Sequence, residues 1–263
     1  MFTKNGNKYL KNLLLSLLSF TIVIVLWTIL SYGFSLPEIT LPSPISVVND
    51  IISLFLLKNL ANDVFISLIR ISIGFGTALI IGIPLGILCG TNKNFSIFVE
   101  TNINFLRFIP AASMIPLLIL WFGVGEIGKI FLIFIRALPY LILYISNAAS
   151  SVDKEYMEMA RVLGAKNSQL LTAVVFPKIV PQIWNIGRIE FGSSWSTVIL
   201  AEVLGANSGL GYRIVLAERY IHISELFGLI IISGGIALLI DYLLRYLDKI
   251  LFPWSDKLKF IKL

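Results

Sequence analysis

Apolar residues fill most of the chain in long runs that short polar segments separate. A helix of about 20 apolar residues crosses the hydrocarbon core of a bilayer. The pattern therefore predicts an all-α, polytopic membrane protein with about six transmembrane helices. The predicted spans are roughly 12–37, 64–90, 103–123, 127–149, 183–204 and 225–247, of which the fifth is weaker because Glu190 and Glu202 interrupt it. No internal repeat, low-complexity tract or second domain is visible, so residues 1–263 are expected to form a single transmembrane domain.

The first apolar run has two interpretations. Lys4, Lys8 and Lys11 precede it, as basic residues precede the apolar region of a signal peptide. The run from Asn12 to Pro37 is longer than such a region, and no small-residue cleavage site follows it. We therefore interpret it as the first transmembrane helix.

Two segments between the runs carry weaker signals. The stretch "LPEITLPSPISVVNDIISLFLL" (residues 36–57) has three prolines followed by a short amphipathic run, which predicts an outer loop and a helix on the membrane surface. The glycine-rich loop at 205–224 is predicted to face outward, with a re-entrant dip into the membrane as an alternative. Pro84, Pro110 and Pro116 interrupt apolar runs and are candidate positions for helix bends.

The distribution of lysine and arginine predicts the orientation, because these residues are retained on the cytoplasmic side. With the amino terminus inside, twelve cations fall in cytoplasmic segments and about four in outer segments or at a helix edge. Both termini are therefore expected in the cytoplasm. The inner cations are Lys4, Lys8, Lys11, Lys93, Lys154, Arg161, Lys166, Lys178, Lys249, Lys257, Lys259 and Lys262.

Composition agrees with this assignment and restricts the chemistry. Hydrophobic residues make up 57% of the chain and charged residues only 14%, whereas soluble domains carry about 25% charged residues. Cys89 is the single cysteine and His222 the single histidine, which excludes an internal disulfide and leaves no metal-ligand cluster. We expect no catalytic, cofactor or metal site in the chain and no nucleic-acid partner.

A polar stretch at 155–177, "EYMEMARVLGAKNSQLLTAVVFP", contrasts with its apolar surroundings. Asp153 is expected to cap a helix over 154–163, and Gly164 to end it in a left-handed conformation. A second short helix is expected to follow Asn167 or Ser168 and to end before Pro177. The stretch is either a solvated cytoplasmic loop or a docking element. Apolar side chains on two capped helices favour docking.

The spacing within this stretch resembles the EAA loop of binding-protein-dependent ABC transporter permeases. Glu158, Ala160, Gly164 and Pro177 match the pattern at the same spacing, while Met159 replaces an alanine. Ala165 follows the motif glycine. Further phrases, "SLIRISIGFGTALIIGIPLGILCG", "IPLLILWFGVGEIGKI" and "AEVLGANSGLGY", are similar in order and spacing to the nitrate/sulfonate/bicarbonate-type permeases.

This resemblance implies a type I ABC importer permease of the cytoplasmic membrane, with a cytoplasmic coupling loop at about 150–181. Such a permease carries a small solute, for example an anion such as nitrate, a sulfonate, taurine or bicarbonate, by alternating access. The implied partners are a cytoplasmic ABC ATPase dimer, a second permease copy in a homodimer, an extracytoplasmic solute-binding protein and membrane lipid. The coupling loop would rest in a groove of the ATPase.

The residues themselves agree on the energy source. No G-x-x-x-x-G-K-[ST] phosphate loop occurs, so ATP and Mg²⁺ are expected on a partner ATPase and not on this chain. An ion-coupled secondary transporter or channel is the alternative, and it leaves the capped cytoplasmic helices unexplained. A membrane-embedded enzyme is rejected because no cluster of nucleophiles, metal ligands or paired acids is found.

Two patterns inside the membrane suggest packing or transport. Small residues recur every four positions in the second span, which predicts close approach of another helix or a sliding surface: Gly74, Ala78, Gly82, Gly86 and Gly90. In the fifth span Glu190, Ser194 and Thr197 share one face, which either packs tightly or lines a wet path.

Arg136, in the fourth span, is predicted to pair with Glu190 because the two residues lie at similar depth in the membrane. The alternative is that Arg136 faces water and attracts an anionic solute unaided.

Overall fold

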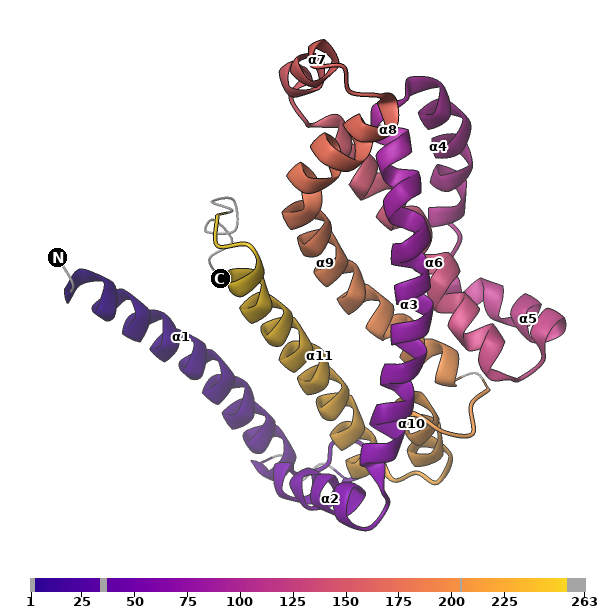
Figure 1. Cartoon of the computed structure of the whole chain (residues 1–263). Helices are drawn as coiled ribbons and strands as arrows, with labels where there is room; N and C mark the ends of the chain where they lie inside the picture. The colour runs from indigo at the N-terminus through magenta and orange to yellow at the C-terminus, as the bar shows by residue number, and fades with distance from the viewer. Residues whose placement is uncertain (1–2, 34–36, 204, 255–263) are drawn as a thin grey trace. The chain divides into compact units, whose positions relative to one another are not determined.

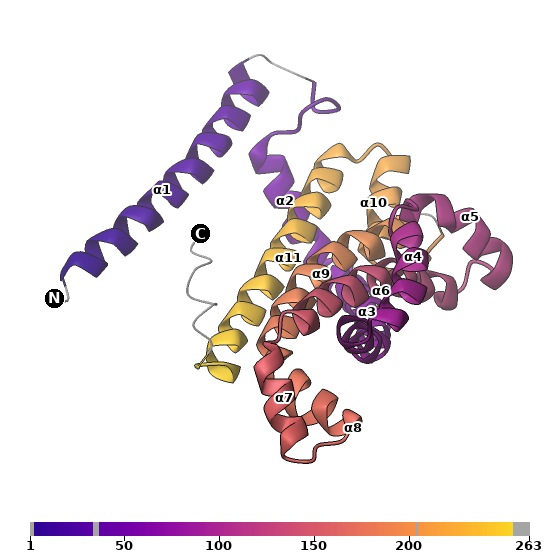
Figure 2. The ribbon, with the colours of Figure 1, turned by 90° about the horizontal axis from the view of Figure 1, so that it is seen from above.

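The computed structural model in Figures 1 and 2 describes residues 3–33, 37–203 and 205–254, and all regular structure in these ranges is helical. The elements are α1 (Thr3–Thr28), a π-helical turn (Ile29–Gly33), α2 (Pro44–Leu56), α3 (Leu60–Thr91), α4 (Lys93–Arg107), α5 (Ala111–Phe122), α6 (Glu126–Ser150), α7 (Lys154–Val162), α8 (Asn167–Gln169), a second π-helical turn (Leu170–Val175), α9 (Phe176–Val203), α10 (Leu210–Arg219) and α11 (Ile223–Leu251). Contacts divide the chain into two compact units, 1–61 with 213–233 and 62–212 with 234–263.

Four predicted spans correspond to helices that are long and apolar enough to cross a membrane. They are α3, α6, the continuous helix Asn167–Val203 and α11. The described apolar part of the first predicted span, Leu17–Gly33, is a shorter helix. The all-α polytopic class is therefore confirmed, with four such helices among the described residues, or five if the bent pair α4–α5 counts as one.

The predicted span at 103–123 is not one straight helix. α4 and α5 meet at an angle of 96°. Pro110 lies at the break, where it lacks an N–H group and restricts the preceding Ile109 to extended conformations. By contrast, Pro84 and Pro116 lie inside continuous helices.

Helix α6 lies at the centre of the larger unit, in contact with α4, α5 and α9. Its buried side chains form much of the core, including Leu132, Ile133, Ala137, Leu141 and Ile145. Figures 1 and 2 show α3, α6 and α9 side by side, with α4 and α5 beside α6.

The small-residue stripe on α3 packs against α6, as the predicted close approach requires. A Cβ atom on Gly86 would lie 2.7 Å from Cβ of Ile145, and one on Gly90 would lie 2.4 Å from the Ser146 carbonyl oxygen. Only glycine permits such short distances between helix backbones. Cys89, on the same helix, is buried.

The smaller unit contains α1, α2 and parts of α10 and α11. The predicted helix after the proline-rich segment is present as α2, where Ser43 accepts a hydrogen bond from the Ser46 N–H at 3.1 Å and Pro44 occupies the first turn. Within this unit, the Trp27 indole N–H donates to the Pro42 carbonyl at 3.0 Å. Whether α2 lies on the membrane surface stays a prediction.

Candidate functional site: a cytoplasmic turn and intramembrane charges

The predicted coupling helix is present as α7 and ends as the sequence predicts. Gly164 has φ +85°, a left-handed conformation. Its N–H donates to the Arg161 carbonyl at 2.9 Å, and the Ala165 N–H donates to the Ala160 carbonyl at 3.0 Å. This pair of bonds defines a Schellman motif. Three of the predicted site residues, Ala160, Gly164 and Ala165, therefore form one helix terminus.

Two details of this segment differ from the prediction. Asp153 precedes α7, but its side chain makes no capping hydrogen bond. The second helix does not end before Pro177, because α8, the π-helical turn and α9 form one continuous helix from Asn167 to Val203. The Phe176 N–H reaches back five residues to the Leu171 carbonyl at the end of the π turn. This wider turn accommodates the missing N–H and the ring of Pro177 without breaking the helix.

The end of α7 exposes apolar side chains. Val162 and Leu163 are 87% and 86% exposed, and Met159 is also exposed. An open hollow on the neighbouring side is lined by Val152, Tyr156, Met159, Ala160, Leu163, Ala173, Val174, Pro177 and Lys178. Glu158 is exposed beside these residues. A segment with this much uncovered apolar surface fits a docking element better than a solvated loop.

Arg136 and Glu190 form the predicted ion pair. The Arg136 Nη1 donates to Glu190 Oε2 at 2.8 Å, and its Nη2 donates to the Ser193 hydroxyl at 2.6 Å. The guanidinium also lies 4.8 Å from the centre of the Tyr140 ring, within the range of a cation–π contact. The pair joins α6 to α9 inside two predicted spans, and the predicted contact is confirmed.

Ser194 and Thr197 lie on the same α9 face as Glu190 and are buried. The Thr197 hydroxyl donates to the Ser193 carbonyl at 3.2 Å. Such burial is what tight packing of α9 against α6 requires. Their role as the wall of a wet path stays a prediction.

The sequence analysis missed a larger buried charge cluster centred on Arg70 of α3. The Arg70 guanidinium donates to Glu126 at 2.6 and 2.8 Å and to Glu202 at 2.7 Å. It also donates to the backbone and hydroxyl oxygens of Ser208. The signal was present in the sequence, because Arg70 and Glu202 are both charged residues inside predicted spans and need partners there.

Backbone N–H groups after α9 complete the cluster. The Gly209 N–H donates to Asp63 at 2.8 Å, the Leu210 N–H to Ser67 at 3.0 Å, and the Gly211 N–H to Glu202 at 2.9 Å. Gly209 has φ +108°, and a Cβ there would lie 2.5 Å from Glu202. The cluster therefore fixes the glycine-rich segment to α3.

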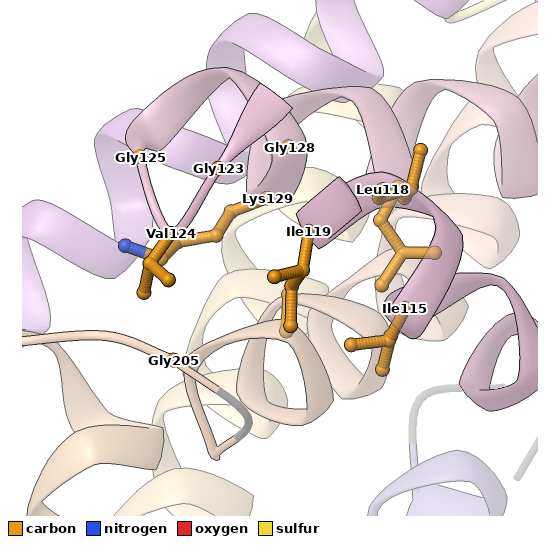
Figure 3. A pocket seen from close by; sticks show the side chains of 11 residues that line it. Ile115, Leu118, Ile119, Gly123, Val124, Gly125, Gly128, Lys129 and Gly205 are labelled. Atoms are coloured by element: carbon orange, nitrogen blue, oxygen red, sulfur yellow. The ribbon is translucent and has the colours of Figure 1, made fainter. Parts of the chain in front are cut away.

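A small cavity lies next to this cluster, between α5, the start of α6 and Gly205 (Figure 3). Its volume is about 30 Å³, which is room for about one water molecule. Figure 3 shows side chains of Ile115, Leu118 and Ile119 around it, with the amine of Lys129 near Val124. The cavity is too small for a transported solute. Among the described residues, no group of three or more His, Cys, Asp and Glu could hold a metal.

The helix group, the charges inside the predicted spans and the exposed apolar turn after α7 are the features of a polytopic membrane protein. Comparison with known proteins identifies its family. The family model described as "Binding-protein-dependent transport system inner membrane component" matches residues 82–255. The chain belongs to this family.

Relatives and solved structures agree with this assignment. The chain is 35% identical over 251 residues to a "Probable ABC transporter permease protein" of Brucella abortus, covering 95% of this chain and 99% of that protein. It is 31% identical to the "Nitrate import permease protein NrtB" of Synechocystis, covering 90% and 88%. The fold is similar to that in a structure of the MetNI methionine ABC transporter, with a TM-score of 0.65, 21% identity and coverage of 73% and 96%.

The chain is therefore the membrane subunit of an ABC importer, a multi-pass inner-membrane protein that transports and does not catalyse. ATPase and solute-binding partners belong to such an importer. The expected sulfonate- and nitrate-type subfamily is confirmed by the relatives.

Proposed function

We propose that the chain works as a pair of identical copies that receive a small solute from an external binding protein and release it into the cytoplasm. Two cytoplasmic ATPases supply the energy through α7, and both termini lie in the cytoplasm. The nitrate permease among the relatives supports a small anion as the solute. In this proposal the Arg136–Glu190 pair lines the path that the solute follows.

One observation carries the coupling part of the proposal: the apolar end of α7 is uncovered beside the Schellman turn of the matched motif. Val162 and Leu163 are among the most exposed large apolar residues of the described chain. Covering them requires a partner surface, and an ATPase groove on the cytoplasmic side supplies one. Glu158 and Pro177 flank the same turn and complete the docking segment.

The test is coexpression of the tagged chain with the ATPase of its own gene neighbourhood. Val162→Ser combined with Leu163→Ser should weaken ATPase binding by about thirtyfold or more and so reduce its recovery, because each of the two buried apolar contacts contributes about 1–2 kcal/mol. Tyr220→Ser combined with Ile221→Ser is the matched control, because these residues are also exposed and are predicted to face the outer side. Equal recovery with both double variants would contradict docking through α7.

Uptake into proteoliposomes distinguishes an ATP-driven importer from an ion-coupled transporter or channel. The reconstituted complex should accumulate solute only with ATP and the binding protein. Transport by the chain alone, without ATP, would instead support an ion-coupled secondary transporter or channel.

A further inference from the structure

Arg107 is a further arginine in an apolar segment, the bent pair α4–α5, and lies at the last position of α4. Its guanidinium carbon lies 4.9 Å from the centre of the Phe108 ring. The Nε atom is buried without a hydrogen-bond partner. No carboxylate among the described residues forms an ion pair with it, so its positive charge is uncompensated within that part of the chain.

Arg107 and Arg136 lie at similar depth. Arg107 is 14 residues from the cytoplasmic start of α4, or about 21 Å along the helix. Arg136 is ten residues from the outer start of α6, or about 15 Å. In a hydrocarbon core of about 30 Å these positions differ in depth by about 6 Å, which two extended arginine side chains can span.

Tyr140 connects the two arginines. Its hydroxyl donates to the Arg107 carbonyl oxygen at 3.1 Å, while its ring contacts the Arg136 guanidinium. Tyr140 therefore lies between the backbone of Arg107 and the guanidinium of Arg136, at the break between α4 and α5. The uncapped amino-terminal end of α5 begins at the same break and adds partial positive charge.

The acids nearby are already engaged. Glu190 pairs with Arg136 at 2.8 Å. Glu100, on α4 two turns nearer the cytoplasm, accepts a hydrogen bond from the Ser146 hydroxyl at 3.0 Å. Arg136 therefore has a carboxylate partner, whereas no carboxylate among the described residues pairs with Arg107, although charges inside a membrane are normally paired.

We propose that Arg107 and Arg136 form an oxyanion-binding site at the break between α4 and α5. A guanidinium presents planar N–H donors that match two oxygens of a nitrate, sulfonate, carboxylate or phosphate group. The oxyanion comes either from the transported solute or from a lipid headgroup. The place of this site in transport rests on the proposed function, but binding of the anion does not.

The test uses the chain with its ATPase in nanodiscs of phosphatidylcholine, without nucleotide. Sodium nitrate and sodium methanesulfonate are titrated at constant ionic strength against sodium chloride, and the thermal unfolding midpoint is recorded. The wild type should show a saturable rise with the oxyanions. Arg107→Gln should weaken the apparent affinity about tenfold, the size expected for one charged hydrogen bond.

Controls separate charge from folding. Arg107→Met is a second neutral variant, and Arg107→Lys, which keeps the charge, should retain most of the affinity. Arg219→Gln removes an exposed cation on α10 and should bind as the wild type does. Discs containing phosphatidylglycerol identify the source, because a gain with this lipid that Arg107→Gln abolishes assigns the site to lipid phosphate.

Two results would overturn the site: a wild-type midpoint insensitive to both oxyanions and anionic lipid, or neutral variants that respond as the wild type does. The titration measures anion binding without nucleotide. Its failure would therefore say nothing against the coexpression test, in which the ATPase would still be recovered. Failure of the proposed function would appear in that recovery and in uptake instead.

Discussion

At the scale of single residues, two helix ends use the same hydrogen-bond pattern with different residues. Gly164 occupies the left-handed position after α7, while Ile221 occupies the equivalent position after α10 with φ 57°. The Ile221 and His222 N–H groups bond to the Glu218 and Ala217 carbonyls, as in a Schellman motif. A β-branched residue such as Ile221 disfavours the left-handed conformation. The turn after α10 therefore forms despite backbone strain, whereas glycine at position 164 adopts the same conformation without it.

The turn at Gly164 is expected to depend on backbone conformation alone. No atom lies within 4 Å of a Cβ at Gly164, so a side chain there meets no obstacle. Gly164→Val should still cost about 1–2 kcal/mol, because valine disfavours the left-handed region. That cost reduces the docked population roughly five- to thirtyfold. Solute-stimulated ATPase activity and uptake of the reconstituted complex should both fall.

Gly164→Asn is the matched control, because asparagine adopts the left-handed conformation readily. It should retain most of the coupling that valine loses. If both variants couple as the wild type does, the turn does not transmit energy.

The Arg136–Glu190 pair should show coupled energetics. Arg136→Leu and Glu190→Ala each leave a lone charge, which costs about 3–5 kcal/mol in a fully buried site and less here because the Arg136 side chain is 22% exposed. The double variant should lose less than the sum of the single losses. Thermal unfolding of the purified chain measures the three losses. Glu218→Ala, on the exposed part of α10, should by contrast be additive with Arg136→Leu.

At the scale of elements, the contact between α3 and α6 depends on specific glycines. A Cβ on Gly86 would lie 2.7 Å from Ile145 Cβ and 3.0 Å from the Ile142 carbonyl oxygen. Gly86→Ala should therefore destabilise the chain by about 1–3 kcal/mol through overpacking. Gly76, on the same helix, has nothing within 4 Å of its Cβ position. Gly76→Ala should be neutral or stabilising by up to about 1 kcal/mol, because alanine favours helix.

Thermal unfolding in one detergent compares the two alanine variants directly. Equal shifts in the midpoint would mean that the helices move apart at little cost. The close approach would then contribute little to the stability of the helix pair.

Local signals in the sequence predicted several helix ends and close helix contacts. Most features that the sequence analysis missed depend on contacts between residues distant in the sequence. The end of α7 at Gly164 and the close approach of α3 follow from a glycine at the helix end and from small-residue spacing. The Arg136–Glu190 pair followed from matching helix depths. The Arg70 cluster escaped prediction because Arg70 and Glu202 are separated by 132 positions. The π turn before Pro177 was missed because a proline usually ends a helix, and widening by one residue is rare.

At the scale of the whole molecule, the buried charges connect helices that are distant in the sequence. The Arg70 cluster joins α3, the first turn of α6, the end of α9 and the glycine-rich segment. The Arg136 pair joins α6 and α9 further from the start of α6 and from the end of α9 than the Arg70 cluster does. Arg188 donates to Asp241 at 2.5 Å and so links α9 to α11. Each predicted span of the larger unit except the bent one thus carries an ion pair with another helix.

The predicted orientation of the chain can be tested by labelling one residue before and one residue after a single candidate span. Val162 on α7 and Tyr220 after α10 are both exposed, and the continuous helix Asn167–Val203 separates them in the sequence. The excess of lysine and arginine on the α7 side predicts that Val162 is cytoplasmic and Tyr220 external. The chain has one natural cysteine, Cys89, which is 3% exposed, so it can be replaced by alanine to give a cysteine-free background. In intact cells, a membrane-impermeant maleimide should label Tyr220→Cys and spare Val162→Cys, and in inverted vesicles the pattern should reverse. Labelling of both positions from the same side would show that Asn167–Val203 does not cross the membrane, and the opposite pattern would reverse the predicted orientation.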